Sequence, residues 1–481
     1  MIRRRTLSLG AAAAISLFAA APASADFAPG ATGLGDAFFP GAGNGGYDVA
    51  HYDLHLRYRP GSGRLDARAL IEATATQDLS AFNLDYRGPQ ITSLTVNGVP
   101  AGFQRAGPEL TVTPAAGIPA GASFTATVHY RGRPQELVDP DDSLEGWVRT
   151  DDGAFVVGEP QGSPTWFPCN DHPTDKATFA IRIKVPRGVE AISNGSLVQR
   201  RRTGRWVSWT WHADAPMAPY LATATIGNFK LERSTIAGLE SVVAVDPRER
   251  RDSERALRRI GHIVRFFRSL YGPYPFGQVG AIIDHAPAVG YALETQTRPI
   301  FDQAPDEVTL AHELSHQWFG DSVSLRNWPD IWLNEGFATW SEWRWTQERG
   351  GLTTRQQFDQ LLREPPTHSD LWAPPPAAIP GPDRLFADSV YERGAMALEA
   401  LRQQIGDPAF YATLRDWTGS HAYGNGTIAE FIALAEGQSG QDLDALFQRW
   451  LYEQGKPERP HGSLSEFSRL QPPLRRTWSR R

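Results

Sequence analysis

The sequence of 481 residues contains a single cysteine, Cys169. One cysteine excludes an intramolecular disulfide and a metal site built mainly from thiolates. A chain of this length also needs no disulfide to support its core. No histidine partner for the thiol is evident in the sequence, so we expect Cys169 to be a buried structural residue rather than a nucleophile.

Positive charge and long hydrophobic runs are also scarce. The sequence has 48 Lys and Arg against 54 Asp and Glu, a balance that disfavours nucleic acid as a partner. Beyond the N-terminus, no apolar stretch is long enough to cross a bilayer. Hydrophobic residues nevertheless make up 41% of the chain, which excludes general disorder. At ~150 residues per domain, the length indicates about two to four domains.

The N-terminus has the three parts of an export signal. Arginines occupy positions 3–5, an apolar stretch covers 7–21, and small residues at 23–25 form a typical cleavage site. We expect residues 1–25 to be removed and the mature chain to be extracellular or periplasmic, without a membrane partner. A retained N-terminal anchor is the alternative, and the consecutive arginines leave both the Sec and the twin-arginine route open.

The first half of the mature chain has the periodicity of β-strands. From about Tyr47 to Lys230, apolar residues alternate with polar ones, as in half-buried strands. Asn97-Gly98 and Asn194-Gly195 are turn signals between such runs. We therefore predict an N-terminal antiparallel β domain over residues 26–232.

After about residue 250, apolar residues recur at helical spacing. Thr427-Ile428-Ala429-Glu430 is a capping box, and Asp407-Pro408 resembles a helix start. We predict a mostly helical domain over residues 233–455, and therefore an α+β multidomain protein. Residues 456–481 form a basic tail, which we expect to be disordered and solvated.

The sharpest local signal is the segment His312-Glu313-Leu314-Ser315-His316. Histidines four residues apart lie on one face of a helix, so both imidazoles can bind the same ion. Eighteen residues separate His316 from Glu335, a spacing that suits a second helix supplying a third ligand. Two His and one Glu leave one zinc position open, as in a catalytic site. The alternative, a helix with two ordinary histidines, is disfavoured by the spaced Glu335.

Glu313 lies next to the first candidate ligand. From there its carboxylate can reach a water activated by the metal and act as the general base. The sequence therefore predicts a zinc-dependent hydrolase with His312, His316 and Glu335 as ligands and Glu313 as a catalytic residue.

These segments resemble the signature of the M1 zinc aminopeptidases. The resemblance rests on residues 312–320 and on Asn334-Glu335-Gly336-Phe337-Ala338. It extends from the β domain, through residues 166–179, to residues 440–444, and so covers nearly all of the mature chain. The family implies a saddle-like β domain followed by a thermolysin-like catalytic domain, with one zinc ion per chain.

The resemblance also implies a carboxylate that holds the free N-terminus of a peptide. In the family, this carboxylate closes a Gly-x-Met-Glu-Asn strand, and Glu294 occupies the corresponding place. Tyr291, Leu293 and Thr295 stand where the family has Gly, Met and Asn, so the resemblance does not define the shape of the first side-chain pocket. We assign Tyr291 and Ala292 to that pocket.

Two further roles follow from the same resemblance. The second contact to the ammonium lies nine residues before Pro168, at Glu159, with Gln161 as the alternative. Val390-Tyr391-Glu392-Arg393-Gly394 is similar to the family's Tyr-Glu-Lys-Gly segment. It implies that the Tyr391 hydroxyl stabilises the oxyanion, which a phenol can do without titrating near neutral pH.

Together, these residues predict an exported, monomeric zinc aminopeptidase that hydrolyses the N-terminal peptide bond of peptides. Three alternatives stay open. A thermolysin-like endopeptidase would use the same zinc chemistry, and an epoxide hydrolase side activity could share the site. A catalytically silent peptide-binding protein is disfavoured, because no ligand, base or tyrosine is missing.

Overall fold

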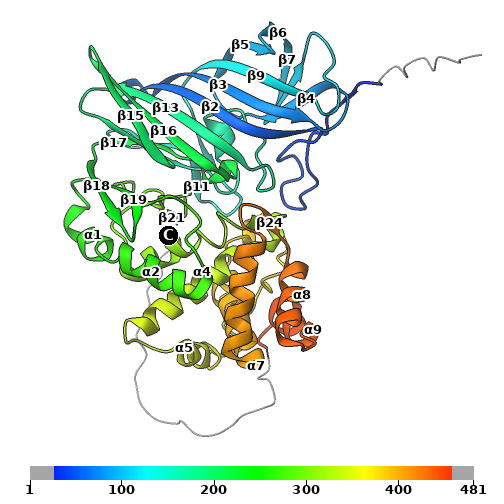
Figure 1. The fold of residues 1–481 in the computed structure, drawn as a ribbon, viewed down its shortest axis with the longest axis vertical. Coiled ribbons are helices and arrows are strands. Elements are labelled where there is room, and N and C mark those ends of the chain that lie inside the picture. Colours follow the sequence, from blue (N-terminus) through cyan, green and yellow to red (C-terminus); the bar gives the residue numbers. More distant parts are fainter. Residues whose placement is uncertain (1–25, 458–481) are drawn as a thin grey trace, which may run out of the picture.

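The structure is a computed structural model that describes residues 26–457. The predicted export signal and the predicted tail after residue 457 lie outside the described residues. Sheets form the upper part of the molecule and helices the lower part (Figure 1). The predicted α+β order, a β domain followed by a mostly helical one, is confirmed; the exact domain boundaries stay predictions. Within residues 26–457, no helix is both long and apolar enough to cross a bilayer.

An eight-stranded sheet dominates the N-terminal domain. Its strands lie in the order β15–β16–β13–β2–β3–β9–β5–β6. In β2, Tyr52, Leu54 and Leu56 are buried while the residues between them are partly exposed, as the period-two pattern predicts. The strands are β2 (Tyr47–Arg59), β3 (Arg64–Ala75), β5 (Gln90–Val96), β6 (Val99–Pro100), β9 (Ser123–Gly132), β13 (Ala177–Pro186), β15 (Ser196–Thr203) and β16 (Trp206–Met217).

One pair in this sheet differs from the predicted antiparallel arrangement. β2 and β13 run parallel over His51–Arg57 and Thr178–Lys184. A total of 117 residues lie between the end of β2 at Arg59 and the start of β13 at Ala177, so no hairpin forces them to be antiparallel. Alternation of polar and apolar residues is the same in both directions, and the sequence pattern therefore does not distinguish them.

Two smaller sheets complete the N-terminal domain, in the orders β1–β4–β8–β7 and β10–β11–β12–β17–β14. The first contains β1 (Ala28–Pro29), β4 (Leu79–Asp85), β7 (Gly102–Ala106) and β8 (Glu109–Thr113). The second contains β10 (Glu136–Val138), β11 (Leu144–Arg149), β12 (Ala154–Val157), β14 (Glu190–Ser193) and β17 (Ala224–Gly227).

The second half of the chain begins with a five-stranded sheet in the order β18–β19–β20–β22–β21. Its strands are β18 (Lys230–Ile236), β19 (Leu239–Val245), β20 (Gln278–Ile283), β21 (Ala292–Leu293) and β22 (Ile300–Phe301). The sequence pattern does not predict this sheet, because buried parallel strands are short apolar runs without alternation. β21 lies at the end of the strand order, and Glu294 directly follows it.

Helices make up most of what remains. They are α1 (Arg250–Leu257), α2 (Ile260–Tyr271), α3 (Glu307–Ser315), α4 (Trp332–Glu348), α5 (Thr354–Leu361), α6 (Ser369–Trp372), α7 (Asp388–Ser420), α8 (Ile428–Ser439) and α9 (Asp444–Phe447). The two-residue strands β23 (Ser324–Leu325) and β24 (Asn425–Gly426) pair with each other. The predicted capping box is present at α8, where the Glu430 carboxylate accepts from the Thr427 N–H at 2.8 Å.

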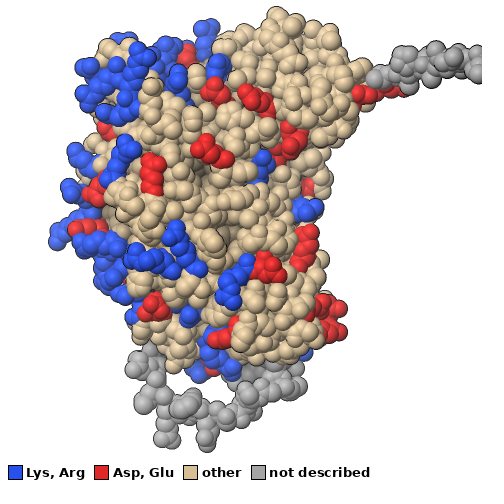
Figure 2. Space-filling view, in the orientation of Figure 1, with Lys and Arg blue, Asp and Glu red and all other residues tan. Residues whose placement is uncertain are grey.

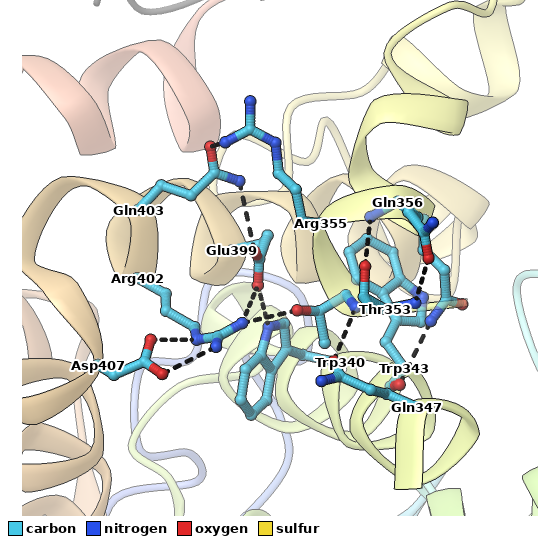
Figure 3. A network of polar contacts seen from close by, with 12 residues as sticks. Trp340, Trp343, Gln347, Thr353, Arg355, Gln356, Glu399, Arg402, Gln403 and Asp407 are labelled. Atoms are coloured by element: carbon cyan, nitrogen blue, oxygen red, sulfur yellow. Dashed lines mark hydrogen bonds and ion pairs between the residues drawn. The ribbon is translucent and has the colours of Figure 1, made fainter. Parts of the chain in front are cut away.

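A polar network ties α4 to α7 (Figure 3). α7 is interrupted at Gly406, where φ is 77° and ψ is 160°, next to the helix start that the sequence predicts. The Asp407 carboxylate accepts from Arg402 at 2.9 and 3.1 Å and so spans this break. Arg402 also donates to Glu399, which accepts from the indole N–H of Trp340 in α4 at 3.2 Å.

Lys176 joins the two domains. It precedes β13 of the N-terminal domain, and its Nζ donates to the carbonyls of Asp321, Ser322 and Gly424 at 3.0, 3.0 and 2.8 Å. Asp321 and Ser322 lie just after the metal-binding segment predicted from the sequence. One ammonium thus fixes the N-terminal domain against the loop behind the candidate site.

Candidate metal centre and active site

α3 carries the first two candidate ligands. Asp306 caps its N-terminus by accepting from the backbone N–H groups of Val308 and Thr309 at 2.9 and 2.7 Å. His316 follows the last residue of α3 and keeps helical dihedral angles, with φ −58° and ψ −23°. His312 and His316 therefore stay one turn apart on the same face, with ring centroids 4.8 Å from each other.

Glu335 approaches both histidines from the first turn of α4. Its Oε2 lies 3.2 Å from His312 Nε2 and 3.6 Å from His316 Nε2. All three side chains are buried, and their ligand atoms lie within 4.8 Å of one another. Zinc bonds of about 2.0–2.2 Å in a tetrahedron place ligand atoms about 3.3–3.6 Å apart. The three predicted ligands are therefore a donor set that fits zinc.

The second nitrogen of each imidazole is already engaged. His312 Nδ1 lies 2.7 Å from Glu342 Oε1, and His316 Nδ1 lies 2.9 Å from the Phe319 carbonyl oxygen. A proton on each Nδ1 therefore donates outward, which leaves both Nε2 lone pairs for a metal.

Sequence reasoning missed Glu342. It lies seven residues after Glu335, two turns along α4, and so shares the face that carries the ligand. A search for a carboxylate at that spacing would have found it.

Burial and charge shift the pKa values of the centre. Burial raises the pKa of Glu313 to about 7, and the nearby histidines only partly offset this. Burial also acts to raise the pKa of Glu335, but His316 and His312 outweigh it and hold that pKa well below its ordinary value. Burial opposes protonation of His312, yet Glu335 and Glu342 raise its pKa well above the ordinary value. The carboxylates thus stabilise positive charge on the groups between them.

Glu294 and Glu159 meet beside the ligand set. Glu294 follows β21, Glu159 follows β12, and carboxylate oxygens of these two residues and of Glu335 lie within 4.8 Å of one another. Both side chains are buried, and Oε1 of each has no hydrogen-bond partner among the described residues. Burial, followed by repulsion from Glu294, raises the pKa of Glu159 well above its ordinary value.

Gln161, the alternative to Glu159, is engaged elsewhere. Its side-chain oxygen accepts from Arg87 at 3.2 Å, and its backbone N–H donates to the Glu145 carboxylate at 3.1 Å. Of the two residues at this loop, the structure therefore brings Glu159 to the centre.

Gln317 fixes the Glu294 segment to the end of α3. Its Oε1 accepts from the Thr297 N–H at 2.7 Å, and its Nε2 donates to the Glu294 carbonyl at 3.1 Å. Sequence reasoning missed this role, because no local pattern shows which distant backbone an amide side chain will meet.

The two residues assigned to the first side-chain pocket lie on either side of the start of β21. The Tyr291 hydroxyl donates to the Leu144 carbonyl of β11 at 2.8 Å, so this tyrosine links the strand to the N-terminal domain. Ala292 is paired with Phe301 of β22 and is half-buried.

Tyr391 reaches the centre because α4 and α7 pack unusually closely. A Cβ on Gly336 would lie 3.0 Å from the Gly394 carbonyl carbon, a contact so tight that a larger residue would push the two helices apart by a few tenths of an ångström. Gly336 follows Glu335, and Gly394 lies three residues after Tyr391. The Tyr391 ring stacks at 21° to the His312 ring, with centroids 6.1 Å apart.

Arg393, beside Tyr391 in the motif, has a structural role. Its buried guanidinium binds the C-terminal end of the described chain and the end of α6, where it donates to the backbone carbonyls of Trp372, Arg449, Trp450, Glu453 and Gly455. These bonds hold the start of α7, and therefore Tyr391, in place.

Cys169 is buried, as predicted. Burial, followed by repulsion from Asp171, raises the pKa of its thiol well above the ordinary value. A thiol that stays protonated is not a nucleophile.

Two family models match the chain. The Peptidase M1 N-terminal domain matches residues 49–221, and the Peptidase family M1 domain matches residues 291–450. Aminopeptidase M1 of Arabidopsis thaliana is 29% identical over 331 residues, which cover 63% of this chain and 37% of the relative. The chain thus spans just over a third of the length of this curated relative.

Solved structures are similar over nearly the whole chain. The crystal structure of an M1 zinc metallopeptidase from Deinococcus radiodurans has a TM-score of 0.83 at 27% identity, covering 90% of this chain and all of that one. A variant of that enzyme bound to a Tyr-ser-ala substrate has a TM-score of 0.82 at 27% identity, over 89% of this chain and 99% of that one. With both family models and this two-domain fold, the chain belongs to peptidase family M1.

Proposed function

We propose that this chain is a zinc-dependent aminopeptidase that hydrolyses the N-terminal peptide bond of peptides. The pair formed by Glu294 and Glu159 carries the proposal. A peptide's ammonium needs an opposite charge when it leaves water, and each of these buried carboxylates has an oxygen without a hydrogen-bond partner in the described part of the chain. Both lie next to the ligand Glu335, so a bound ammonium would be beside the metal.

The chain's own residues supply the remaining steps. When bound by His312, His316 and Glu335, zinc lowers the pKa of water and polarises a carbonyl oxygen. In this proposal Glu313 accepts a proton from the attacking water and returns it to the leaving amine. The Tyr391 hydroxyl donates to the carbonyl oxygen as that oxygen gains charge.

The relatives support the substrate class. The Arabidopsis relative is named an aminopeptidase, and the Deinococcus variant is bound to a tripeptide substrate. For this chain we propose peptides with a free N-terminus as substrates. We also propose export, on the basis of the signal-like residues 1–25, and a monomeric state.

A pair of peptide series tests the function. One has free N-termini and the other is N-acetylated, and both are assayed with and without a chelator. We expect release of single residues from the free peptides only, and loss of that activity with the chelator. Internal cleavage of acetylated peptides would instead indicate an endopeptidase. No hydrolysis by the zinc-loaded chain would indicate a silent peptide-binding protein.

Glu294→Gln removes one charge from the ammonium site and keeps the shape of the side chain. We expect kcat/KM for aminoacyl substrates to fall by about 30-fold or more, mainly through KM, because a buried charge pair is broken. Glu109→Gln is the matched control, since Glu109 also has unpartnered buried oxygens but lies in β8. Equal kinetics for the Glu294 variant and the wild type would contradict the assignment.

Tyr391→Phe removes the hydroxyl and keeps the ring. We expect kcat to fall by ~10²-fold or more, as for other lost oxyanion donors, while zinc content stays unchanged. Tyr411→Phe, farther along α7, serves as the control and should behave like the wild type. A Tyr391 variant with near-normal kcat would refute the role.

Glu342→Gln keeps the contact to His312 Nδ1 but removes its charge. We expect zinc affinity to fall by about 10- to 100-fold, the usual effect of losing a carboxylate behind a metal-bound histidine. Competition with a fluorescent chelator measures this loss. Glu348→Gln at the exposed end of α4 is the control. Unaltered zinc affinity in the Glu342 variant would show that its carboxylate does not tune the ligand.

A further inference from the structure

A cluster of cations, here called the basic corner, lies at one end of the eight-stranded sheet. Its members come from the β2, β13 and β15–β16 segments and are Arg57, Arg59, Lys184, Arg187, Arg201 and Arg205. Figure 2 shows Lys and Arg gathered at the edge of the molecule where Figure 1 places the ends of β13, β15 and β16. The corner is far in sequence from the metal ligands and belongs to the opposite domain.

Strand register places three of these cations in one row. Arg201 is paired with Ser208, Ser208 with Lys184, and Lys184 with Arg57. Residues in register across strands share a face of the sheet, and neighbouring like charges there are destabilising. In this row Lys184 and Arg57 are direct neighbours, Ser208 separates Lys184 from Arg201, and Asp66 is paired with Arg57 on its other side.

Three cations of the corner, including Lys184 of the row, also lie around Trp206 on the same face. The charged groups of Arg59, Lys184 and Arg205 each lie 5.7 Å from the centroid of its ring. The Arg187 N–H donates to the Arg205 carbonyl at 3.0 Å, which joins the β13 and β15–β16 turns. These contacts join the strand ends and turns that carry the basic corner.

Little negative charge opposes this cluster. Asp66 lies 3.0 Å from Arg57 and 2.6 Å from Arg59. In the described part of the chain, no other carboxylate lies within 4.0 Å of a charged nitrogen of the six. Two exposed turns form this edge of the sheet, at residues 187–188 and 204–205. Gly188 and Gly204 lie in these turns.

We propose that the basic corner binds the surface of an anionic phospholipid bilayer. Guanidinium groups bind phosphate oxygens through paired hydrogen bonds, and clusters of this size adsorb to anionic lipid surfaces. The corner lies at an outer edge of the molecule, where a planar surface can approach. Trp206 is half-buried and already contacts three cations, so its ring is less available for stacking by the bases of a single-stranded nucleic acid.

This partner departs from the expectation drawn from composition. The charge balance disfavours nucleic acid, and the expectation for the mature chain is no membrane partner. Both criteria average over the sequence. The fold brings cations from separate strands to one edge, and adsorption there requires no spanning segment.

Vesicle flotation of the full chain tests the proposal, with vesicles of phosphatidylcholine alone and mixed with phosphatidylglycerol. We expect binding to the anionic vesicles only, weakened by salt. Arg201→Glu with Arg205→Glu should reduce that binding at least about tenfold and leave peptide hydrolysis unchanged, which also shows that the variant folds. Arg250→Glu with Arg251→Glu in α1 changes net charge equally and should bind like the wild type.

Four results would overturn the proposal. They are no binding to anionic vesicles at low salt, equal losses in both double variants, and preferential binding of a single-stranded oligonucleotide through the same arginines. The fourth is self-association of the Arg201–Arg205 variant together with no vesicle binding by the wild type. That result would show that the arginines of the edge strand β15 serve to prevent strand pairing instead.

Discussion

The active site depends on the burial of negative charge around one point. Glu159, Glu294, Glu313, Glu335 and Glu342 are all buried there, and the imidazoles of His312 and His316 partly offset the charge of Glu313. Removing a carboxylate from water costs several kcal/mol unless a cation or hydrogen bonds replace the lost solvation. The fold offsets this in part by drawing protons and imidazoles inward. A divalent ion beside Glu335 and a substrate ammonium beside Glu294 and Glu159 would supply the positive charge that is still missing.

Packing between separate helices, strands and loops brings the side chains of the site together. The contact between Gly336 and Gly394 brings Glu335 and Tyr391 together from α4 and α7. Gln317 ties the Glu294 backbone to the end of α3, and Lys176 holds the N-terminal domain against the loop that follows. Because Glu159 belongs to that domain, the proposed ammonium site needs both domains in contact.

The ligand set could be predicted from sequence because its spacing maps directly onto helical turns, and the distances among His312, His316 and Glu335 agree with it. Glu342 was missed although the same rule reaches it two turns along α4. Gln317 and the parallel pairing of β2 with β13 could not be predicted, since both depend on contacts between distant segments. The basic corner belongs to the same class, because alternation shows which face a residue occupies but not which strands are neighbours.

Zinc titration of the metal-free chain, with peptide hydrolysis followed in parallel, shows whether the buried His and Glu residues form a catalytic zinc site. We expect hydrolysis of a free dipeptide to rise in proportion to bound zinc and to saturate at one ion per chain. We also expect Glu335→Gln to lose both the ion and the activity, because this carboxylate completes the ligand set. Hydrolysis by the metal-free chain, or full zinc binding and activity in the Glu335 variant, would contradict a catalytic zinc site at these residues.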